Sequence, residues 1–374
     1  MQGAATQAMS DIVEFARDAP FSRVAGRTCS KMRIYFCASP WAKIRWRIPT
    51  LKPFILACLA SLLVHRGAAG EFPQAEISNS LIRAKLYLPD ASQGYYRGTR
   101  FDWSGVVASL EWNGHNYFGK WFEHHDPKLN DAITGPVEEF STNNAGLGYD
   151  EAKPGESFVK IGVGALRKPD EPRYSSFNTY EIMDSGKWGV KNGSDWIEFR
   201  HELPDTSGYA YTYRKRIHLS KNKPELVLEH TLKNTGRKVI ATSVYDHNFF
   251  MLDDQPTGPD FVVKFPFDLR ATADLKGLAE IRGKELVYLQ ELQKGQTVFT
   301  NLEGHGSKSS DYDIRVENRK TGTGVRLTGD RPLLKVVFWS IRSNISPEPY
   351  IDMRVEPGKE STWRILYEFY TLPK

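Results

Sequence analysis

The sequence predicts an all-β protein in which two large, mainly antiparallel sheets face each other. From residue 174 onward, short segments of alternating apolar and polar residues follow one another, separated by turns. Alternation with a period of two at short, regular spacing is typical of a β-sandwich. Aromatic residues make up 12% of the chain, and such side chains favour strands. The expected strands here are Tyr174–Asp184, Trp196–Glu202, Tyr209–Leu219, Glu225–Lys233 and Lys238–Phe250.

The segments before residue 174 extend this pattern. Ile77–Leu88 is an expected strand. Val106–Trp112 and His115–Trp121 are expected to pair as a hairpin, because the Asn-Gly dipeptide between them favours a type I′ turn. Phe158–Leu166 is a further expected strand, and its two glycines indicate close backbone packing.

The C-terminal part continues the pattern with two interruptions. Leu333–Ile341 is an almost continuous apolar strand that we expect to be buried on both faces, and Thr362–Thr371 is the expected closing strand. Residues 272–283 are the one expected helix, and Ser343–Tyr350 is an expected loop. Because no repeat, low-complexity tract or linker divides residues 71–374, we expect a single domain there.

Residues 1–70 are predicted to be a leader with a secretory signal peptide. No Asp or Glu occurs between Lys31 and Val64, and the apolar run Phe54–Val64 precedes the small residues Gly67–Gly70. The run of 11 residues is too short to span a bilayer as a helix. The basic region before the run is unusually long for a signal peptide, so the true start is expected at Met32. The alternatives to a signal peptide are a buried apolar helix or an uncleaved anchor.

The leader also contains the excess of positive charge and every cysteine. Residues 1–70 hold 10 Lys and Arg against 3 Asp and Glu, so residues 71–374 are slightly acidic, with 40 against 42. Nucleic acid is therefore not an expected partner. The three cysteines all precede residue 70, so disulfides and thiolate chemistry are not expected after cleavage. The mature protein is expected to be periplasmic or secreted, without a membrane span.

The irregular segment Phe122–Tyr149 is rich in polar residues and is typical of a functional or mobile region. It contains His124-His125-Asp126, but neighbouring side chains on an extended chain point in opposite directions. No metal site and no cofactor are therefore expected. The segment Tyr95–Gly105 is dense in Arg, Tyr and Trp, and its Arg100 and Trp103 are candidate sugar contacts.

His247 is the main candidate for chemistry. It ends a predicted strand within the polar cluster Tyr245-Asp246-His247-Asn248. On an unbroken strand His247 shares a face with Tyr245 and Phe249, while Asp246 and Asn248 point the other way. Such a histidine is either a hydrogen-bonded core residue or a general acid in a groove, since imidazole exchanges protons near neutral pH.

The motif Asn234-Thr235-Gly236, followed by Asp246-His247-Asn248-Phe249-Phe250, resembles the galactose mutarotase (aldose 1-epimerase) family, which carries an Asn-His-x-Tyr-Phe signature. The resemblance covers roughly residues 75–372. It implies a β-supersandwich whose groove floor is Tyr245–Phe250, with Tyr245 and Asn248 as substrate contacts. It also implies that His247 protonates the ring oxygen of a sugar.

The resemblance further implies a glutamate that takes the proton from the anomeric hydroxyl. That position holds Arg342 here, and the family's second histidine aligns near Thr134-Gly135-Pro136. The base is therefore expected to be Glu348, Glu138 or Glu139, or to be absent. Glu138 and Glu139 alternate, so at most one should point inward. The alternative for each glutamate is a surface carboxylate. Arg342, with Arg100, would suit an anionic sugar.

The expected function is an exported carbohydrate-active protein, foremost an isomerase that resembles aldose 1-epimerases. Its expected partner is a small sugar or the end of a glycan, with no particular oligomeric state. The alternatives are a non-catalytic carbohydrate-binding protein and a lyase or hydrolase acting on uronate-containing glycans, because a fold does not fix a function.

Overall fold

A computed structural model describes residues 72–373, all of which belong to one compact unit. The predicted leader lies outside these residues. The described part is built from strands and two short 3₁₀ turns, η1 (Leu252–Asp254) and η2 (Ser309–Asp311). Every strand pairing in it is antiparallel. The predicted all-β class, with large antiparallel sheets, is confirmed.

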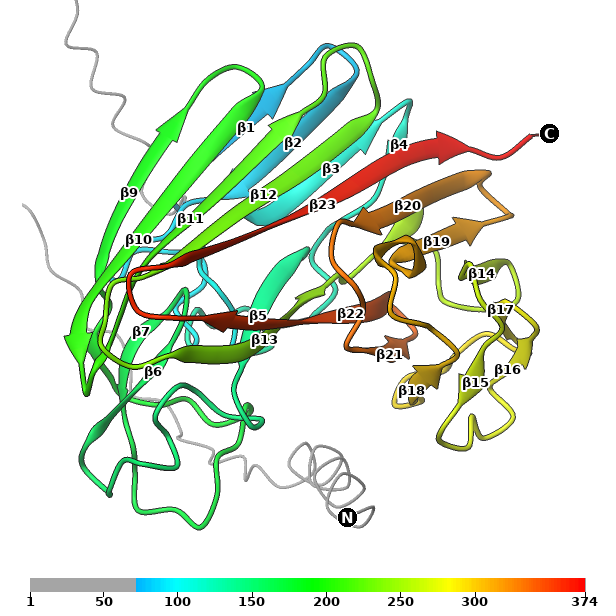
Figure 1. Cartoon of the computed structure of the whole chain (residues 1–374). Coiled ribbons are helices and arrows are strands. Elements are labelled where there is room, and N and C mark those ends of the chain that lie inside the picture. Colours follow the sequence, from blue (N-terminus) through cyan, green and yellow to red (C-terminus); the bar gives the residue numbers. More distant parts are fainter. Residues whose placement is uncertain (1–71, 374) are drawn as a thin grey trace, which may run out of the picture. The chain divides into compact units, whose positions relative to one another are not determined.

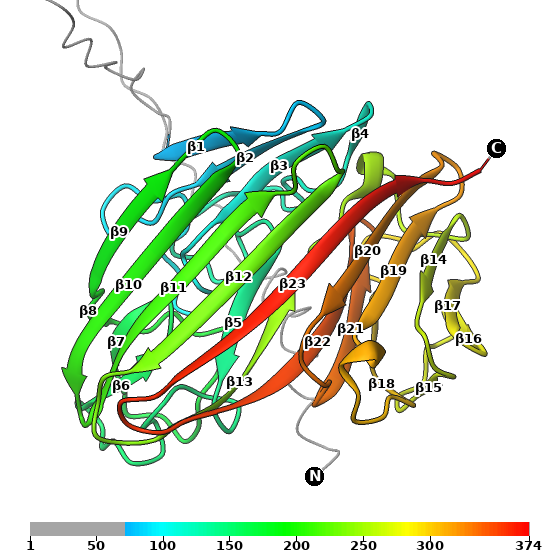
Figure 2. The same cartoon turned by 45° about the horizontal axis from the view of Figure 1, so that its top comes forward.

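The larger layer is a ten-stranded sheet, and Figure 2 shows its strands side by side from β9 to β16. Its middle strands come from the regions with the clearest alternation, and Tyr209–Leu219 has the predicted bounds. In spatial order the strands are β16 (Ala279–Arg282), β17 (Glu285–Tyr288), β14 (Phe261–Lys264), β19 (Asp313–Asn318), β20 (Thr323–Gly329), β23 (Glu360–Thr371), β12 (Glu225–Asn234), β11 (Tyr209–Leu219), β10 (Trp196–Thr206) and β9 (Lys187–Asn192).

The facing layer is a six-stranded sheet, which lies below the large sheet in Figure 1. It joins β5 to strands that lie about a hundred or more residues later in the chain. In spatial order the strands are β15 (Arg270–Ala271), β18 (Val298–Glu303), β21 (Lys335–Ile341), β22 (Asn344–Val355), β13 (Ile240–His247) and β5 (Val137–Ser141).

Two small sheets complete the unit. One contains β1 (Gln74–Ser78), β2 (Ile82–Tyr87), β3 (Val106–Trp112) and β4 (His115–Asn116). The other contains β6 (Ser157–Lys160), β7 (Gly164–Arg167) and β8 (Ile182–Asp184). The predicted Asn-Gly hairpin is confirmed, since Asn113 and Gly114 join β3 to β4 with φ of 50° and 80°.

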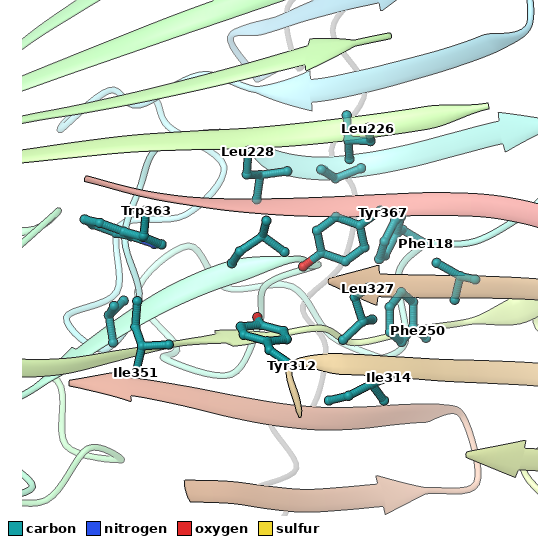
Figure 3. Close-up of a cluster of buried hydrophobic side chains, with 14 of the residues drawn as sticks. Phe118, Leu226, Leu228, Phe250, Tyr312, Ile314, Leu327, Ile351, Trp363 and Tyr367 are labelled. Atoms are coloured by element: carbon teal, nitrogen blue, oxygen red, sulfur yellow. The ribbon is translucent and has the colours of Figure 1, made fainter. Parts of the chain in front are cut away.

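The space between the two large sheets is filled by apolar and aromatic side chains. Leu226 and Leu228 of β12 point into it together with Trp363 and Tyr367 of β23 (Figure 3). All four side chains are buried. Burying one leucine contributes roughly 2 kcal/mol, so this layer is the main source of stability.

Several predicted segments differ from the structure. Of the expected strand Tyr174–Asp184 only Ile182–Asp184 (β8) forms, and the strand expected at His115–Trp121 ends at Asn116. The expected helix at 272–283 is wrong: Lys276 and Gly277 form a turn at positive φ, and β16 follows. The expected loop at Ser343–Tyr350 is wrong as well, because it forms the first half of β22. The predicted strands Ile77–Leu88 and Phe158–Leu166 are each divided by a turn, so the two glycines of the second belong to a hairpin.

Candidate active site

Strands β5 and β13 are neighbours, and each carries adjacent polar residues that point to opposite faces. Glu138 lies opposite Asp246, and Glu139 lies opposite Tyr245. Because side chains alternate along a strand, Glu138 and Asp246 face the large sheet, whereas Glu139, Tyr245 and His247 face away from it. The predicted alternation of the two glutamates holds, yet both are buried, since both faces of β5 are covered.

The inner face of these strands holds a closed cluster of charges. Glu138 accepts a short hydrogen bond from Lys215 of β11 and pairs with His230 Nε2 of β12 at 2.6 Å. All three side chains are fully buried. Despite the opposing effect of burial, the nearby Lys215 and His230 hold the pKa of Glu138 at about 2. Glu138 therefore joins the two sheets and has no access to a substrate.

Asp246 belongs to the same inner cluster. Its Oδ2 accepts a 2.8 Å hydrogen bond from Tyr367, which also donates to Asn248 Oδ1 at 2.8 Å. Burial, with the neighbouring Glu138 charge, raises the pKa of Asp246 to about 8. Asn248 is fully buried here. The structure thus places Asn248 between the sheets and not on the groove floor that the resemblance implied.

On the outer face, His247 lies opposite Glu348 in the register of β13 with β22. The two side chains touch: His247 Nε2 is 3.2 Å from Glu348 Oε1, and their exposed fractions are 6% and 7%. On the other side of the ring, Nδ1 is 2.9 Å from Ser346 Oγ. The carboxylate across from His247 is therefore Glu348.

Aromatic rings enclose the imidazole of His247. Phe249 stacks on it with ring centroids 3.6 Å apart, while Phe101 and Trp339 meet it edge-on at 5.6 and 5.4 Å. His247, Tyr245 and Phe249 lie on one face, as the alternation predicts. This apolar enclosure removes the imidazole from water and makes its charged form unfavourable.

Two prolines in β22 explain why the ladder with β13 is interrupted between Tyr245–Tyr350 and Phe250–Ile345. Ile345 exchanges backbone hydrogen bonds with Phe250 of the neighbouring segment. Positions 347 and 349 have the same orientation as Ile345, so an N–H at either position would also point toward β13. Proline has no N–H to donate, and the ladder is interrupted there. The Asn248 side chain compensates in part by donating to the Pro347 carbonyl at 2.6 Å. The two prolines therefore leave the backbone ladder between β13 and β22 incomplete beside the His247–Glu348 pair.

Burial shifts the pKa values of this pair in opposite directions. The pKa of His247 is lowered well below its usual value by burial and, to a smaller extent, by Arg100. Burial raises the pKa of Glu348 to about 8. Near neutral pH the pair therefore holds one exchangeable proton, on the carboxyl group. The Nδ1–H of His247 can donate to Ser346 Oγ, and the unprotonated Nε2 then faces the carboxyl group of Glu348 at 3.2 Å.

A hollow of about 230 Å³ lies on the outer face. Neither His247 nor Glu348 lines it, but Tyr245 and Tyr350 do, each two residues along its strand from a member of the pair. Its lining is polar and includes both strand residues and loop residues. The residues that line it are Arg100, Glu139, Ser141, Asn143, Asn144, Ser176, Ser243, Tyr245, Lys335 and Tyr350. Another hollow, of about 420 Å³, lies beside Trp112 and His115 and contains none of the predicted site residues.

Glu139 is the carboxylate of the hollow, and its oxygens are already occupied. Arg100 Nε donates to it at 2.8 Å and Tyr245 OH at 2.6 Å, and Lys160 Nζ lies 3.4 Å away. Although burial opposes ionisation, the Arg100 and Lys160 charges and these hydrogen bonds lower the pKa of Glu139. A stable carboxylate that accepts three donors is a poor base. Glu139 is suited to holding Arg100 and Tyr245 in place.

Two predicted contacts lie outside the hollow. Arg342 is in the turn between β21 and β22, where it pairs with Glu291 at 2.8 Å. Trp103 is buried, and its Nε1 donates to the Gly98 carbonyl at 2.8 Å. Arg100 and Tyr245, by contrast, do line the hollow.

Sequence reasoning missed Lys160, Lys335, Ser346 and Tyr350. Lys335 and Tyr350 face each other across β21 and β22, and Lys335 Nζ lies 4.1 Å from the centre of the Tyr350 ring. One signal in the sequence could have identified Ser346 and Tyr350. The polar residues Ser346, Glu348 and Tyr350 occupy every second position, with the two prolines between them, which is the spacing of one face of a strand. Interpreting the prolines as a loop concealed it.

Residues 72–373 were also compared with the requirements of a metal site and of a membrane-spanning helix. Within that range no three His, Cys, Asp or Glu side chains are grouped as ligands for a metal. His125 instead stacks on Tyr95, with ring centroids 4.0 Å apart. The same range contains no helix with the length and apolar character needed to cross a membrane.

Comparison with known proteins places the architecture. No family model matches the sequence, and no curated protein matches it either. Among solved structures, a GalM/aldose epimerase homologue from C. elegans is similar over 80% of this chain and 99% of its own, with 14% identity and a TM-score of 0.52. A protein from Synechocystis sp. PCC 6803 is similar over 80% and 96%, with 14% identity and a TM-score of 0.50. The resemblance inferred from the motifs is thus confirmed at the level of the fold: this chain has the galactose mutarotase-like fold.

Proposed function

We propose that this protein is a carbohydrate-active isomerase that interconverts the anomers of a sugar hemiacetal, with His247 and Glu348 as its acid–base pair. The observation that carries the proposal is their direct contact at 3.2 Å on neighbouring strands. Opposite pKa shifts support it, because one proton can then move between two groups of different chemistry.

The reaction needs one proton donated and one accepted at adjacent oxygens. Glu348 donates its proton to the ring oxygen, and the neutral imidazole of His247 takes the proton of the anomeric hydroxyl. The bond between C1 and the ring oxygen breaks, which gives an open-chain aldehyde. After rotation about C1–C2 the ring closes on the other face of C1, and both protons return. The sugar oxygens replace the direct contact between the two side chains.

This assignment exchanges the roles that the resemblance implied, in which His247 is the acid. The exchange follows from burial, which favours neutral imidazole and neutral carboxyl over an ion pair. Ring opening and ring closure require opposite proton movements, so each residue acts once as acid and once as base in a full cycle. Arg100, held by Glu139, has further N–H groups that can donate to sugar hydroxyls, whereas the Tyr245 hydroxyl, which donates its proton to Glu139, can accept from one.

The test is polarimetry of freshly dissolved sugars with wild-type protein, His247→Gln and Glu348→Gln. Each variant should lose roughly 100-fold or more of the rate above the spontaneous reaction, the usual contribution of one acid–base group. Arg342→Gln, which changes a charged residue outside the hollow, serves as the control and should retain the wild-type rate. Unchanged anomer interconversion in His247→Gln would falsify the assignment.

A non-catalytic sugar-binding protein is the second candidate. It is favoured because His247 and Glu348 contact each other and are more than nine-tenths buried, so neither side chain is exposed to a ligand in this structure. Calorimetric binding of a sugar, together with no turnover by the wild-type protein, would select this candidate over the isomerase.

A further inference from the structure

Lys335 is the one lysine that lines the hollow. It begins β21 and lies opposite Tyr350 of β22, on the same face as Glu348. Its ammonium group sits 4.1 Å from the centre of the Tyr350 ring. The ring supports the cation from one side, as in other cation–π contacts, and leaves the ammonium hydrogens directed elsewhere.

Lys335 differs from the other two cations beside the hollow in the partners of its charge. Arg100 is matched by Glu139 and by Asp131, each at 2.8 Å. Lys160 is matched by Glu139 at 3.4 Å and by the Phe140 carbonyl at 2.7 Å. Within residues 72–373, Lys335 has neither a hydrogen-bond acceptor nor a carboxylate partner at contact distance; only the Tyr350 ring meets it.

The charge balance around the hollow is therefore positive. Arg100, Lys160 and Lys335 supply three positive charges, against the two carboxylates Glu139 and Asp131. Glu348, the remaining acid nearby, contributes no full charge while it carries its proton. A half-buried ammonium without a partner is unfavourable, and an anionic ligand would relieve this.

Position along the sheet indicates where that charge would lie on a ligand. Glu348 is opposite Val337, two residues along β21 from Lys335. Two residues of a strand span about 7 Å. This distance is much longer than a C–O bond and is similar to the distance between substituents on opposite sides of a sugar ring. Lys335 is thus close enough to contact the same sugar as Glu348, but at a carbon other than C1.

We propose that the natural ligand is a sugar bearing an anionic group away from C1, a carboxylate or a phosphate, and that Lys335 binds this group. The inference deepens the proposed function and rests on the hollow being its sugar site. The hollow of about 230 Å³ lies below the range of roughly 300–1,000 Å³ typical of drug-sized ligands, which suits one sugar residue.

The test compares three ligands by calorimetry: galactose, galacturonate and galactose 6-phosphate. Wild-type protein should bind at least one of the acidic sugars roughly tenfold more tightly than galactose, and the stronger of the two identifies the group. Lys335→Met should lose this preference while keeping its affinity for galactose. Lys335→Arg should retain most of the preference because it keeps the charge. Lys294→Met removes a lysine that is 86% exposed and should behave like the wild type.

Several results would overturn the inference. Equal affinity of the wild type for all three sugars would do so, as would a preference that survives in Lys335→Met. Loss of galactose affinity to the same extent would show instead that Lys335 only donates to hydroxyls. An acidic-sugar preference without polarimetric turnover would remove the isomerase while leaving the binding inference intact, so the two failures are distinguishable.

Discussion

The two faces of β5 and β13 carry the same kinds of residue with different consequences. On the inner face, Glu138 and Asp246 lie buried between the sheets, where Lys215 neutralises Glu138 and His230 is hydrogen-bonded to it. On the outer face, Glu139 is neutralised by Arg100 and Lys160, but it lines a hollow that a ligand can enter. Alternation along a strand thus places a structural charge cluster directly behind a candidate active site. Access decides which cluster can do chemistry.

The largest effect is expected from breaking the inner pair. Lys215→Met leaves the carboxylate of the fully buried Glu138 with His230 as its hydrogen-bond partner and without the lysine charge, which should lower the free energy of unfolding by about 3–5 kcal/mol. Urea denaturation measures this. The double variant Lys215→Met/Glu138→Leu should recover part of the loss, since an apolar pair leaves no stranded charge. A single variant as stable as the wild type would show that the inner cluster is not a structural link.

A smaller effect is expected on the outer face. Glu139→Gln removes the carboxylate from Arg100 and Lys160, but Arg100 keeps Asp131 and the amide can still accept from Tyr245. The free energy of unfolding should fall by about 1.5 kcal/mol, the value of a hydrogen bond to a charged group. The same denaturation series checks it. A loss as large as that of Lys215→Met would contradict the difference drawn between the faces.

A third effect concerns pH and sharpens the account of the inner face. Burial raises the pKa of Asp246 from 3.8 to about 8, so the unfolded chain loses this proton at lower pH than the folded protein. Asp246 therefore makes the free energy of unfolding fall as pH rises between these two values. Asp246→Asn keeps an acceptor for Tyr367 and should make this decline shallower. Denaturation at about pH 5 and about pH 8 measures the change; an unaltered decline would contradict it.

Much of the fold could be predicted because alternation is a local property. Tyr209–Leu219 was predicted to the residue, and the side of the strand on which His247 lies followed from its neighbours. The first half of β22 could not be predicted in the same way, because its two prolines resemble a loop. They are tolerated since both fall at positions that donate toward β13, so the pairing with β21 is intact.

By itself the sequence determined the all-β class, the two-layer arrangement and the candidate histidine, since each depends on the order of neighbouring residues. It left three glutamates open as partners of His247. The tertiary structure decided among them. Glu138 is held inside by Lys215, Glu139 is occupied by Arg100, and Glu348 meets the imidazole. That choice depends on strand register between β13 and β22, about a hundred residues apart, and on which face has access to solvent. Neither property is encoded in any local stretch of residues.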